Sequence, residues 1–167
     1  MLMNRNSLLA KLKKIKLLIL DVDGVLTDGT IYFTHTGKEI LSFHVHDGLG
    51  IERLQKMEIK VAIISGRDTS AVKHRLTQLK IEHQFLGQRN KVSRYLNLID
   101  QLRLSADQVA YVGDDLPDID IMKQVGVPIA VANAFDIVKK TAIFCTKKKG
   151  GHGAVREVCD LIIEANV

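Results

Sequence analysis

Two carboxylates able to do chemistry, Asp21 and Asp23, follow an apolar run and precede a glycine in the segment LLILDVDGVLT, residues 17–27. Carboxylates this close repel each other unless a proton or a cation lies between them, so the pair indicates a Mg²⁺ site. Spacing alone is equally compatible with a turn aspartate followed by an Asp-Gly turn. The apolar run is typical of a strand buried on both faces.

Other polar groups stand where later strands end. Ser65 lies in SGR after the second strand, Asp114 lies in GDD after a later one, and Lys91 begins a predicted helix. Because a parallel sheet brings its carboxyl ends to one edge, we expect these three side chains to join Asp21 and Asp23 there. The carboxylates match an octahedral oxygen site for Mg²⁺. A hydroxyl, helix N–H groups and a lysine match a phosphate, and a carboxylate beside both is an attacking nucleophile.

The elements that position these residues alternate between strand and helix, which predicts an α/β fold of Rossmann-like type: a mostly parallel sheet with helices on both faces. We expect one domain over residues 1–167, without repeats or linkers. The patterns predict strands at 17–20, 60–65, 83–86, 108–112, 127–131 and 142–145. They predict helices at 7–14, 48–57, 69–79, 91–102, from 115 or 117 to 125, after 133, and at 154–165.

A β-hairpin is predicted over about residues 30–46, with a turn around Thr36 and Gly37. We expect this hairpin to project from the sheet edge that carries Asp21 and Asp23. Because an isolated hairpin is marginal in water, we also expect it to pack on another subunit. Asp47 is predicted to cap the helix that follows it. A glycine-rich tail covers about residues 147–167.

Composition limits the partners. The net charge is +5 and the pI near 9.2. This positive charge suits an anionic partner, of which nucleic acid is the general case. With 5% aromatic residues and no tryptophan, however, side chains on which bases could stack are scarce, and a small phosphorylated or carboxylated metabolite fits the charge as well. No apolar run reaches the length of a membrane span. Cys145 and Cys159 lack a CxxC spacing and are interpreted as reduced core thiols of a cytoplasmic protein.

DVDGVLT, SGR, Lys91 and GDDLPD resemble, in order, the four motifs of the haloacid dehalogenase superfamily of phosphotransferases. The segments DVDGVLTDG, FHVHDGLGI and GGHGAVREVCDLI resemble a narrower family, the 3-deoxy-D-manno-octulosonate 8-phosphate phosphatases. The resemblance implies Mg²⁺-dependent hydrolysis of that phosphosugar for lipopolysaccharide precursor synthesis. It further implies a cytoplasmic homotetramer without a large cap domain, in which hairpins assemble the tetramer and a neighbouring subunit completes each pocket.

The resemblance also implies roles for single residues. Asp21 is the nucleophile that forms an aspartyl-phosphate, and Asp23 is the general acid and then the general base. Mg²⁺ is held by the Asp21 carboxylate, the backbone carbonyl of Asp23 and Asp114. The further roles it implies are phosphate binding by Ser65, Gly66 and Lys91, orientation by Asp118 behind the metal, and substrate contacts by His46, Asp47, Arg67, His152 and Arg156.

Several alternatives stay open. His46 and His152 stand where relatives often have arginine, which makes the substrate less certain than the reaction. Asp115 is either a helix cap or a metal ligand, and Arg156 either anchors the tail helix or reaches substrate. Other functions to weigh are a phosphatase for another phosphosugar, such as a nine-carbon sialic-type acid 9-phosphate, a receiver domain, and a catalytically silent regulatory protein. A receiver carries its phosphorylated aspartate after a middle strand, where this chain has Ser65.

Overall fold

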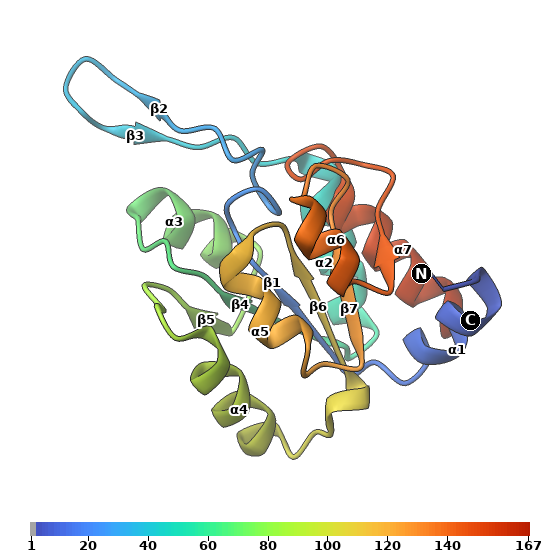
Figure 1. Cartoon of the computed structure of the whole chain (residues 1–167). Helices are drawn as coiled ribbons and strands as arrows, with labels where there is room; N and C mark the ends of the chain where they lie inside the picture. Colours follow the sequence, from blue (N-terminus) through green and yellow to red (C-terminus); the bar gives the residue numbers. More distant parts are fainter. Residues whose placement is uncertain (1–2) are drawn as a thin grey trace.

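A parallel six-stranded sheet forms the centre of the structure, a computed structural model that describes residues 3–167 (Figure 1). Its strand order is β5-β4-β1-β6-β7-β8, and each neighbouring pair is parallel. The strands are β1 (Leu17–Leu20), β4 (Lys60–Ile64), β5 (His83–Phe85), β6 (Val109–Gly113), β7 (Val127–Ala130) and β8 (Phe144–Cys145). The predicted parallel α/β sheet is confirmed.

The central strand, β1, is apolar because both of its faces are covered. All four of its residues are 0% exposed, and it pairs with β4 on one side and β6 on the other. A strand buried on both faces ends where the sheet meets solvent, so the first polar residue after it lies at the carboxyl edge. That residue is Asp21.

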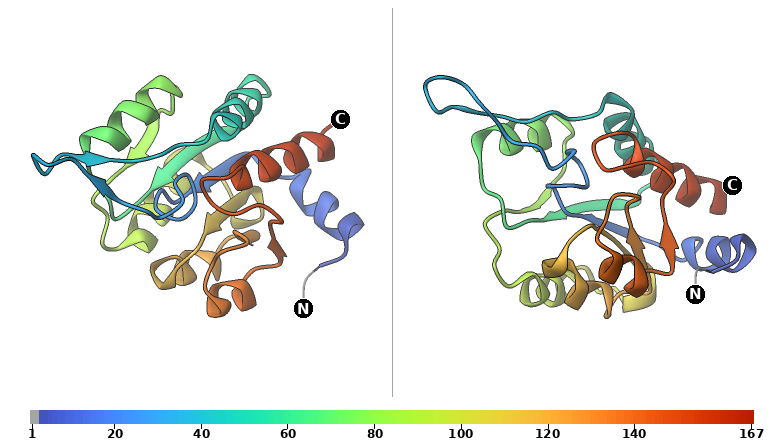
Figure 2. Two further views of the ribbon diagram at one scale, coloured as in Figure 1. Left: turned by 90° about the horizontal axis from the view of Figure 1, so that it is seen from above. Right: turned by 45° about the horizontal axis from the view of Figure 1, so that its top comes forward.

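Helices cover both faces of the sheet (Figure 2). One face carries α1 (Arg5–Leu12), α2 (Val45–Lys56), α3 (Ser70–Gln78) and α7 (Ala154–Ala165), and the other carries α4 (Lys91–Leu102), α5 (Ile119–Met122) and α6 (Asp136–Thr141). Two 3₁₀ turns, η1 (Ala106–Gln108) and η2 (Leu116–Asp118), precede β6 and α5. A single hydrophobic cluster runs from Leu8 to Ile162. Among the described residues, no helix is both long and apolar enough to cross a bilayer.

The hairpin, β2 (Tyr32–Phe33) and β3 (Glu39–Ile40), projects from the carboxyl edge in Figure 1. It is shorter than predicted: its second strand ends at Ile40, and α2 begins at Val45 rather than at residue 48. His44 ends the extended segment: its Nδ1 accepts a hydrogen bond from the backbone N–H of His46 and caps α2. The predicted cap at Asp47 is therefore wrong.

Other boundaries differ by a few residues. The strand predicted at 142–145 begins only at Phe144, because the backbone N–H of Ala142 still donates to the carbonyl of Val138 at the end of α6. The helix predicted to reach residue 125 ends at Met122. Cys145 and Cys159 are both free thiols; Cys159 is buried as predicted, whereas Cys145 is partly exposed.

Candidate active site

The three strand ends singled out in the sequence meet in one cavity of about 380 Å³, which we call the carboxyl-edge cavity. Asp21 follows β1, Ser65 follows β4 and Asp114 follows β6. The residues that line the cavity are Asp21, Asp23, Ser65, Gly66, Arg67, Gln88, Arg89, Lys91, Asp114, Asp115 and Pro117. The predicted convergence is therefore present in the structure.

Lys91, the first residue of α4, enters this cavity from the side and is only 6% exposed. Its Nζ lies 3.0 Å from Oδ1 of Asp21 and 2.8 Å from Oδ1 of Asp118. Burial lowers the pKa of this ammonium, but the charges of Asp21 and Asp118 outweigh burial and the pKa is raised. Lys91 is thus a fixed positive charge beside Asp21, not a solvated helix lysine.

Asp118 lies behind the cavity, fully buried, with both carboxylate oxygens engaged. Oδ1 accepts from Nζ of Lys91 at 2.8 Å and from the hydroxyl of Tyr111 at 2.6 Å. Oδ2 accepts from the backbone N–H groups of Asp114 at 2.9 Å and Asp115 at 3.2 Å. Although Asp118 lies close enough to Asp21 and Asp114 to share a cation with them, these four donors fit an orienting role better than a direct ligand.

Asp21 and Asp114 are less well compensated: within residues 3–167 the Asp21 carboxylate has Lys91 as its ion-pair partner, and the Asp114 carboxylate has no ion pair. Burial, opposed by the charge of Lys91 and assisted by that of Asp118, raises the pKa of Asp21 to about 6. Burial and the charges of Asp118, Asp21 and Asp115 raise the pKa of Asp114 to about 7. A buried and a partly buried carboxylate that resist ionisation side by side are stabilised by a cation, and hard oxygen donors suit Mg²⁺.

Gly24 leaves space for the Asp114 carboxylate. Its φ is +72°, and a Cβ added to it would overlap Oδ2 of Asp114. A side chain at this position would therefore displace one of the two candidate ligands, and the positive φ is a conformation that glycine adopts at low cost. The residues present fit a divalent cation held by Asp21 and Asp114. The backbone carbonyl of Asp23 accepts no backbone hydrogen bond within the described chain and is available as a third ligand.

The Asp23 side chain points to Arg67. Nε of Arg67 lies 2.7 and 2.5 Å from the two Asp23 oxygens, and Nη1 lies 2.6 Å from Oε1 of Glu39 in the hairpin. Burial lowers the pKa of the Arg67 guanidinium, but hydrogen bonding and charge from Asp23 and Glu39 outweigh burial, and the pKa is raised. Arg67 therefore joins the loop after β1, the loop after β4 and the hairpin.

Ser65 is 1% exposed and does not cap α3, whose cap is Thr69. Its Oγ accepts from the backbone N–H of Arg67 at 3.2 Å, and Gly66 lies beside it on the cavity wall. The hydroxyl remains free to donate to a bound anion. Asp115 caps η2 by accepting from the backbone N–H of Leu116 at 2.7 Å, which favours the cap over the metal ligand.

Three of the five predicted substrate residues lie elsewhere. His46, His152 and Arg156 line a separate cavity of about 780 Å³ beside α1 and α7, the α1–α7 cavity, which shares no lining residue with the carboxyl-edge cavity. Only Arg67 lies in the carboxyl-edge cavity. Residues 146–153 connect the α1–α7 cavity to the loop after β1. Within this segment, the backbone N–H of Gly151 donates to the carbonyl of Val25.

Asp47 lines neither of these two cavities and is 1% exposed. Its Oδ1 accepts from the backbone N–H of Arg156 at 2.7 Å, so it caps α7, more than a hundred residues away. Oδ2 is buried without a partner, and burial raises the pKa of the Asp47 carboxyl. A direct substrate contact by Asp47 is not supported, because its carboxylate lies beneath the start of α7. Arg156 anchors this helix through its backbone and through a side-chain bond to Asp160 at 2.7 Å.

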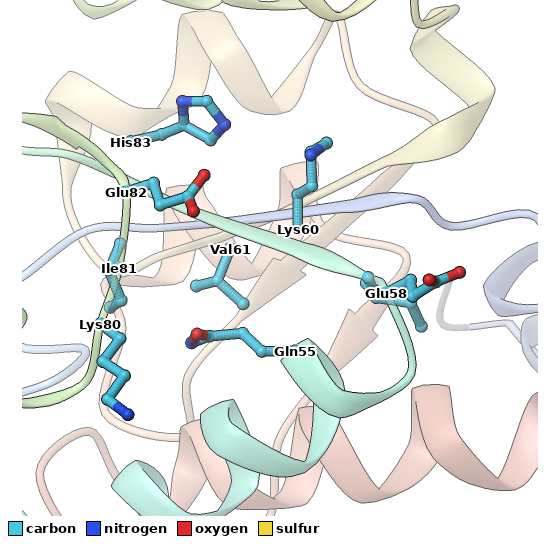
Figure 3. Close-up of a pocket in the computed structure, with 9 residues that line it drawn as sticks. Gln55, Glu58, Lys60, Val61, Lys80, Ile81, Glu82 and His83 are labelled. Atoms are coloured by element: carbon cyan, nitrogen blue, oxygen red, sulfur yellow. The ribbon is translucent and has the colours of Figure 1, made fainter.

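A third cavity, of about 420 Å³, opens at the opposite end of the sheet (Figure 3). It lies between the end of α2 and the amino ends of β4 and β5, with Lys60, Lys80, Glu58 and Glu82 around it. Ligands of open α/β sheets bind at the carboxyl ends of the strands. None of the predicted site residues lines this cavity.

Sequence reasoning missed two participants. Tyr111 supplies a buried hydroxyl to Asp118, and burial together with the charge of Asp118 raises its pKa well above the ordinary value. A tyrosine inside an apolar strand is a signal for such a bond, because a buried hydroxyl needs a partner. Glu39 carries no comparable local signal, since its partner Arg67 lies 28 residues away.

Comparison with known proteins agrees with this geometry. A family model described as haloacid dehalogenase-like hydrolase matches residues 86–158. The 3-deoxy-D-manno-octulosonate 8-phosphate phosphatase of Escherichia coli strain K12 is 46% identical over 157 residues, which cover 94% of this chain and 84% of that protein.

Solved structures extend the similarity. The phosphatase of the same name from Yersinia pestis has a TM-score of 0.93 and 46% identity, covering 95% of this chain and 85% of the other. That from Moraxella catarrhalis, solved with a magnesium ion, a phosphate ion and a KDO molecule, has a TM-score of 0.94 and 40% identity over 97% of this chain and 93% of the other. The chain belongs to the 3-deoxy-D-manno-octulosonate 8-phosphate phosphatase family of the haloacid dehalogenase-like hydrolases.

Proposed function

We propose that this protein is a Mg²⁺-dependent phosphatase that converts 3-deoxy-D-manno-octulosonate 8-phosphate to 3-deoxy-D-manno-octulosonate and phosphate, and so supplies a lipopolysaccharide precursor. The observation that carries the proposal is Asp21: a buried carboxylate at the end of β1, 3.0 Å from the Lys91 ammonium and close to Asp114. The names of the relatives, and the ligands of the Moraxella catarrhalis structure, support the substrate and the metal.

The reaction begins with attack of the Asp21 carboxylate on phosphorus. Asp23 donates a proton to the leaving alkoxide, and the phosphoryl group is then on Asp21 as an acyl phosphate. Asp23, now deprotonated, takes a proton from water, which attacks the same phosphorus and releases phosphate. Each of these steps uses a side chain that lines the carboxyl-edge cavity.

Charge on the transferring phosphoryl group is met by fixed donors. Lys91, held in place by Asp118, and the Ser65 hydroxyl with the backbone around Gly66 bind its oxygens, where negative charge must be offset in the transition state. Asp21, Asp114 and the backbone carbonyl of Asp23 would hold Mg²⁺, which would supply further positive charge there.

We propose that the active form is a homotetramer. The hairpin exposes Tyr32 (51%), Phe33 (67%) and Ile40 (51%), apolar side chains that favour contact with a second copy. The proposed substrate role of His46, His152 and Arg156 requires such a contact, because in one chain they lie outside the carboxyl-edge cavity. We also propose a cytoplasmic location, in keeping with two free thiols.

A panel of phosphorylated sugars and sugar acids, assayed with Mg²⁺, tests the proposal. We expect the octulosonate 8-phosphate to have the highest kcat/KM, and Asp21→Asn to abolish turnover of every substrate. A flat response across the panel, or preference for a nine-carbon acid 9-phosphate, would overturn the substrate assignment. Failure to hydrolyse a generic aryl phosphate would overturn the enzyme class and favour a silent regulatory protein.

A further inference from the structure

One arginine ties the hairpin to the side chain that serves as general acid and base. Arg67 lies between two carboxylates, Asp23 from the loop after β1 and Glu39 from β3. Its side chain is 17% exposed and that of Glu39 is 19% exposed, whereas that of Asp23 is 37% exposed. The two outer residues of this triad belong to segments that make no backbone ladder with each other.

The pair between Glu39 and Arg67 is well shielded. Nη1 of Arg67 meets Oε1 of Glu39 at 2.6 Å, a charge-assisted bond in a largely buried setting. Oε2 of Glu39 is buried without a hydrogen-bond partner. Leaving a buried carboxylate oxygen unsatisfied has a free-energy cost, so the position of Glu39 is explained better by what it does to Arg67 than by its own hydrogen bonding.

The hairpin cannot fix this arrangement alone. Only two residue pairs join β2 and β3, Tyr32 with Ile40 and Phe33 with Glu39, and a hairpin of that size is marginal in water. The ion pair is therefore a main restraint between the hairpin and the carboxyl edge. In return, the hairpin fixes which way the Arg67 guanidinium faces, and thus how it holds both oxygens of Asp23.

We propose that Glu39 is a positioning residue for the general acid and base: by holding Nη1 of Arg67 it sets the orientation in which Asp23 meets the leaving-group oxygen. This inference rests on the proposed phosphatase function. Without Glu39, the freed guanidinium turns further onto Asp23 and draws its carboxylate away from that oxygen. Glu39 itself touches neither substrate nor metal in this scheme.

The proposal makes a prediction that depends on the leaving group. The parameter kcat/KM reports the steps up to the first irreversible one, transfer of the phosphoryl group to Asp21. An alkoxide leaves poorly without a proton, so this step needs Asp23 in place, whereas p-nitrophenolate leaves without one. General acid catalysis is worth roughly 10²–10⁴-fold, and misplacement by about an ångström costs up to roughly 10²-fold.

The test compares Glu39→Gln with the wild-type protein on two substrates without a carboxylate, ribose 5-phosphate and p-nitrophenyl phosphate, both with Mg²⁺. We expect kcat/KM for ribose 5-phosphate to fall by roughly 10- to 100-fold, and that for p-nitrophenyl phosphate to stay near the wild-type value. Lys38→Gln is the matched control: this exposed neighbour in the hairpin makes no ion pair within residues 3–167, and both values should be unchanged.

Melting temperature and particle mass are measured for each variant, so that a folding or assembly defect is visible. Equal losses on both substrates would overturn the proposal in favour of a structural role for Glu39, and no loss on either would overturn it directly. Absence of wild-type activity on p-nitrophenyl phosphate would instead refute the proposed phosphatase function. The two failures are therefore distinguishable.

Discussion

Replacing Asp118 by asparagine removes one negative charge from the centre of the site and keeps the shape of the side chain. The asparagine oxygen replaces Oδ2 and still accepts from the backbone N–H groups of Asp114 and Asp115. Its amide NH₂ then faces the Lys91 ammonium and the hydroxyl of Tyr111, where the wild-type protein has an acceptor. The hydroxyl can rotate to accept, but the ammonium cannot.

The expected loss follows from this geometry. A hydrogen bond between charged groups is worth about 1.5–3 kcal/mol, and Lys91 retains Asp21 as a partner at 3.0 Å. Removing the charge of Asp118 also relieves repulsion on Asp114 and Asp21, which offsets part of the loss when no metal is bound. With Mg²⁺ bound that relief matters less, and we expect a loss of about 2 kcal/mol in the free energy of unfolding.

Urea unfolding in the presence of Mg²⁺ measures this loss. At a slope of about 2 kcal/mol per molar urea, the midpoint should fall by about 1 M. Magnesium affinity, from calorimetry or from activity against Mg²⁺ concentration, should weaken about 10- to 100-fold, as is typical when the group behind a ligand is lost. Asp120→Asn, an exposed change two residues away, should alter neither quantity. Unchanged affinity in Asp118→Asn would refute the orienting role.

Three further outcomes are expected. Burial raises the pKa of Asp47 above 3.8, so ionisation of this carboxyl costs stability as pH rises through the raised value. The unfolding free energy of Asp47→Asn should therefore increase relative to that of the wild-type protein between pH 4 and pH 8. Parallel curves of unfolding free energy against pH would contradict this. Gly24→Ala should weaken Mg²⁺ binding about tenfold or more. Gly37→Ala, with a similar φ of +76° and no atom near its Cβ, should not weaken it. Equal Mg²⁺ affinities of the two variants in calorimetry would count against the overlap between a Cβ at residue 24 and the Asp114 carboxylate. Phe33→Ser should reduce the particle mass in analytical ultracentrifugation, and Phe135→Ser, a similarly exposed control, should leave it unchanged; a tetramer in both would exclude assembly through the hairpin.

The convergence of Asp21, Ser65 and Asp114 was predictable because it depends on local signals. Each residue follows a run apolar enough to be a buried strand, and parallel strands bring their carboxyl ends to one edge. Lys91 was predictable for a similar reason, since it opens a helix that enters the sheet from the same end. The alternation of strands and helices predicted the fold, and the boundaries of the six strands in the main sheet were accurate to about two residues, whereas the hairpin is shorter than predicted.

The function of Asp47 was not predictable from its neighbours. An aspartate before an apolar helical pattern is a good cap by local chemistry, yet His44 caps α2 and Asp47 caps α7. The deciding contact joins residues 47 and 156, which only the packing of α2 on α7 brings together. Sequence periodicity shows that both helices are amphipathic, but it does not show which polar atoms meet between them.

The link between Glu39, Arg67 and Asp23 was also outside the reach of sequence reasoning. Arg67 was predicted to contact substrate, and its position in the carboxyl-edge cavity agrees with that prediction without testing it. Its ion pair with Asp23 joins two loops, and its ion pair with Glu39 depends on the direction in which the hairpin leaves the sheet edge. A marginal element with two residue pairs leaves no pattern that fixes this direction.

The central claim is that Asp21 carries the phosphoryl group during turnover. Enzyme quenched with acid during turnover with Mg²⁺ and treated with borohydride should contain homoserine at position 21, because borohydride reduces an acyl phosphate but not a free carboxylate. Peptide mass spectrometry locates the modification. Homoserine at residue 21 and its absence without substrate would support the account; homoserine at another aspartate, or none during active turnover, would contradict it.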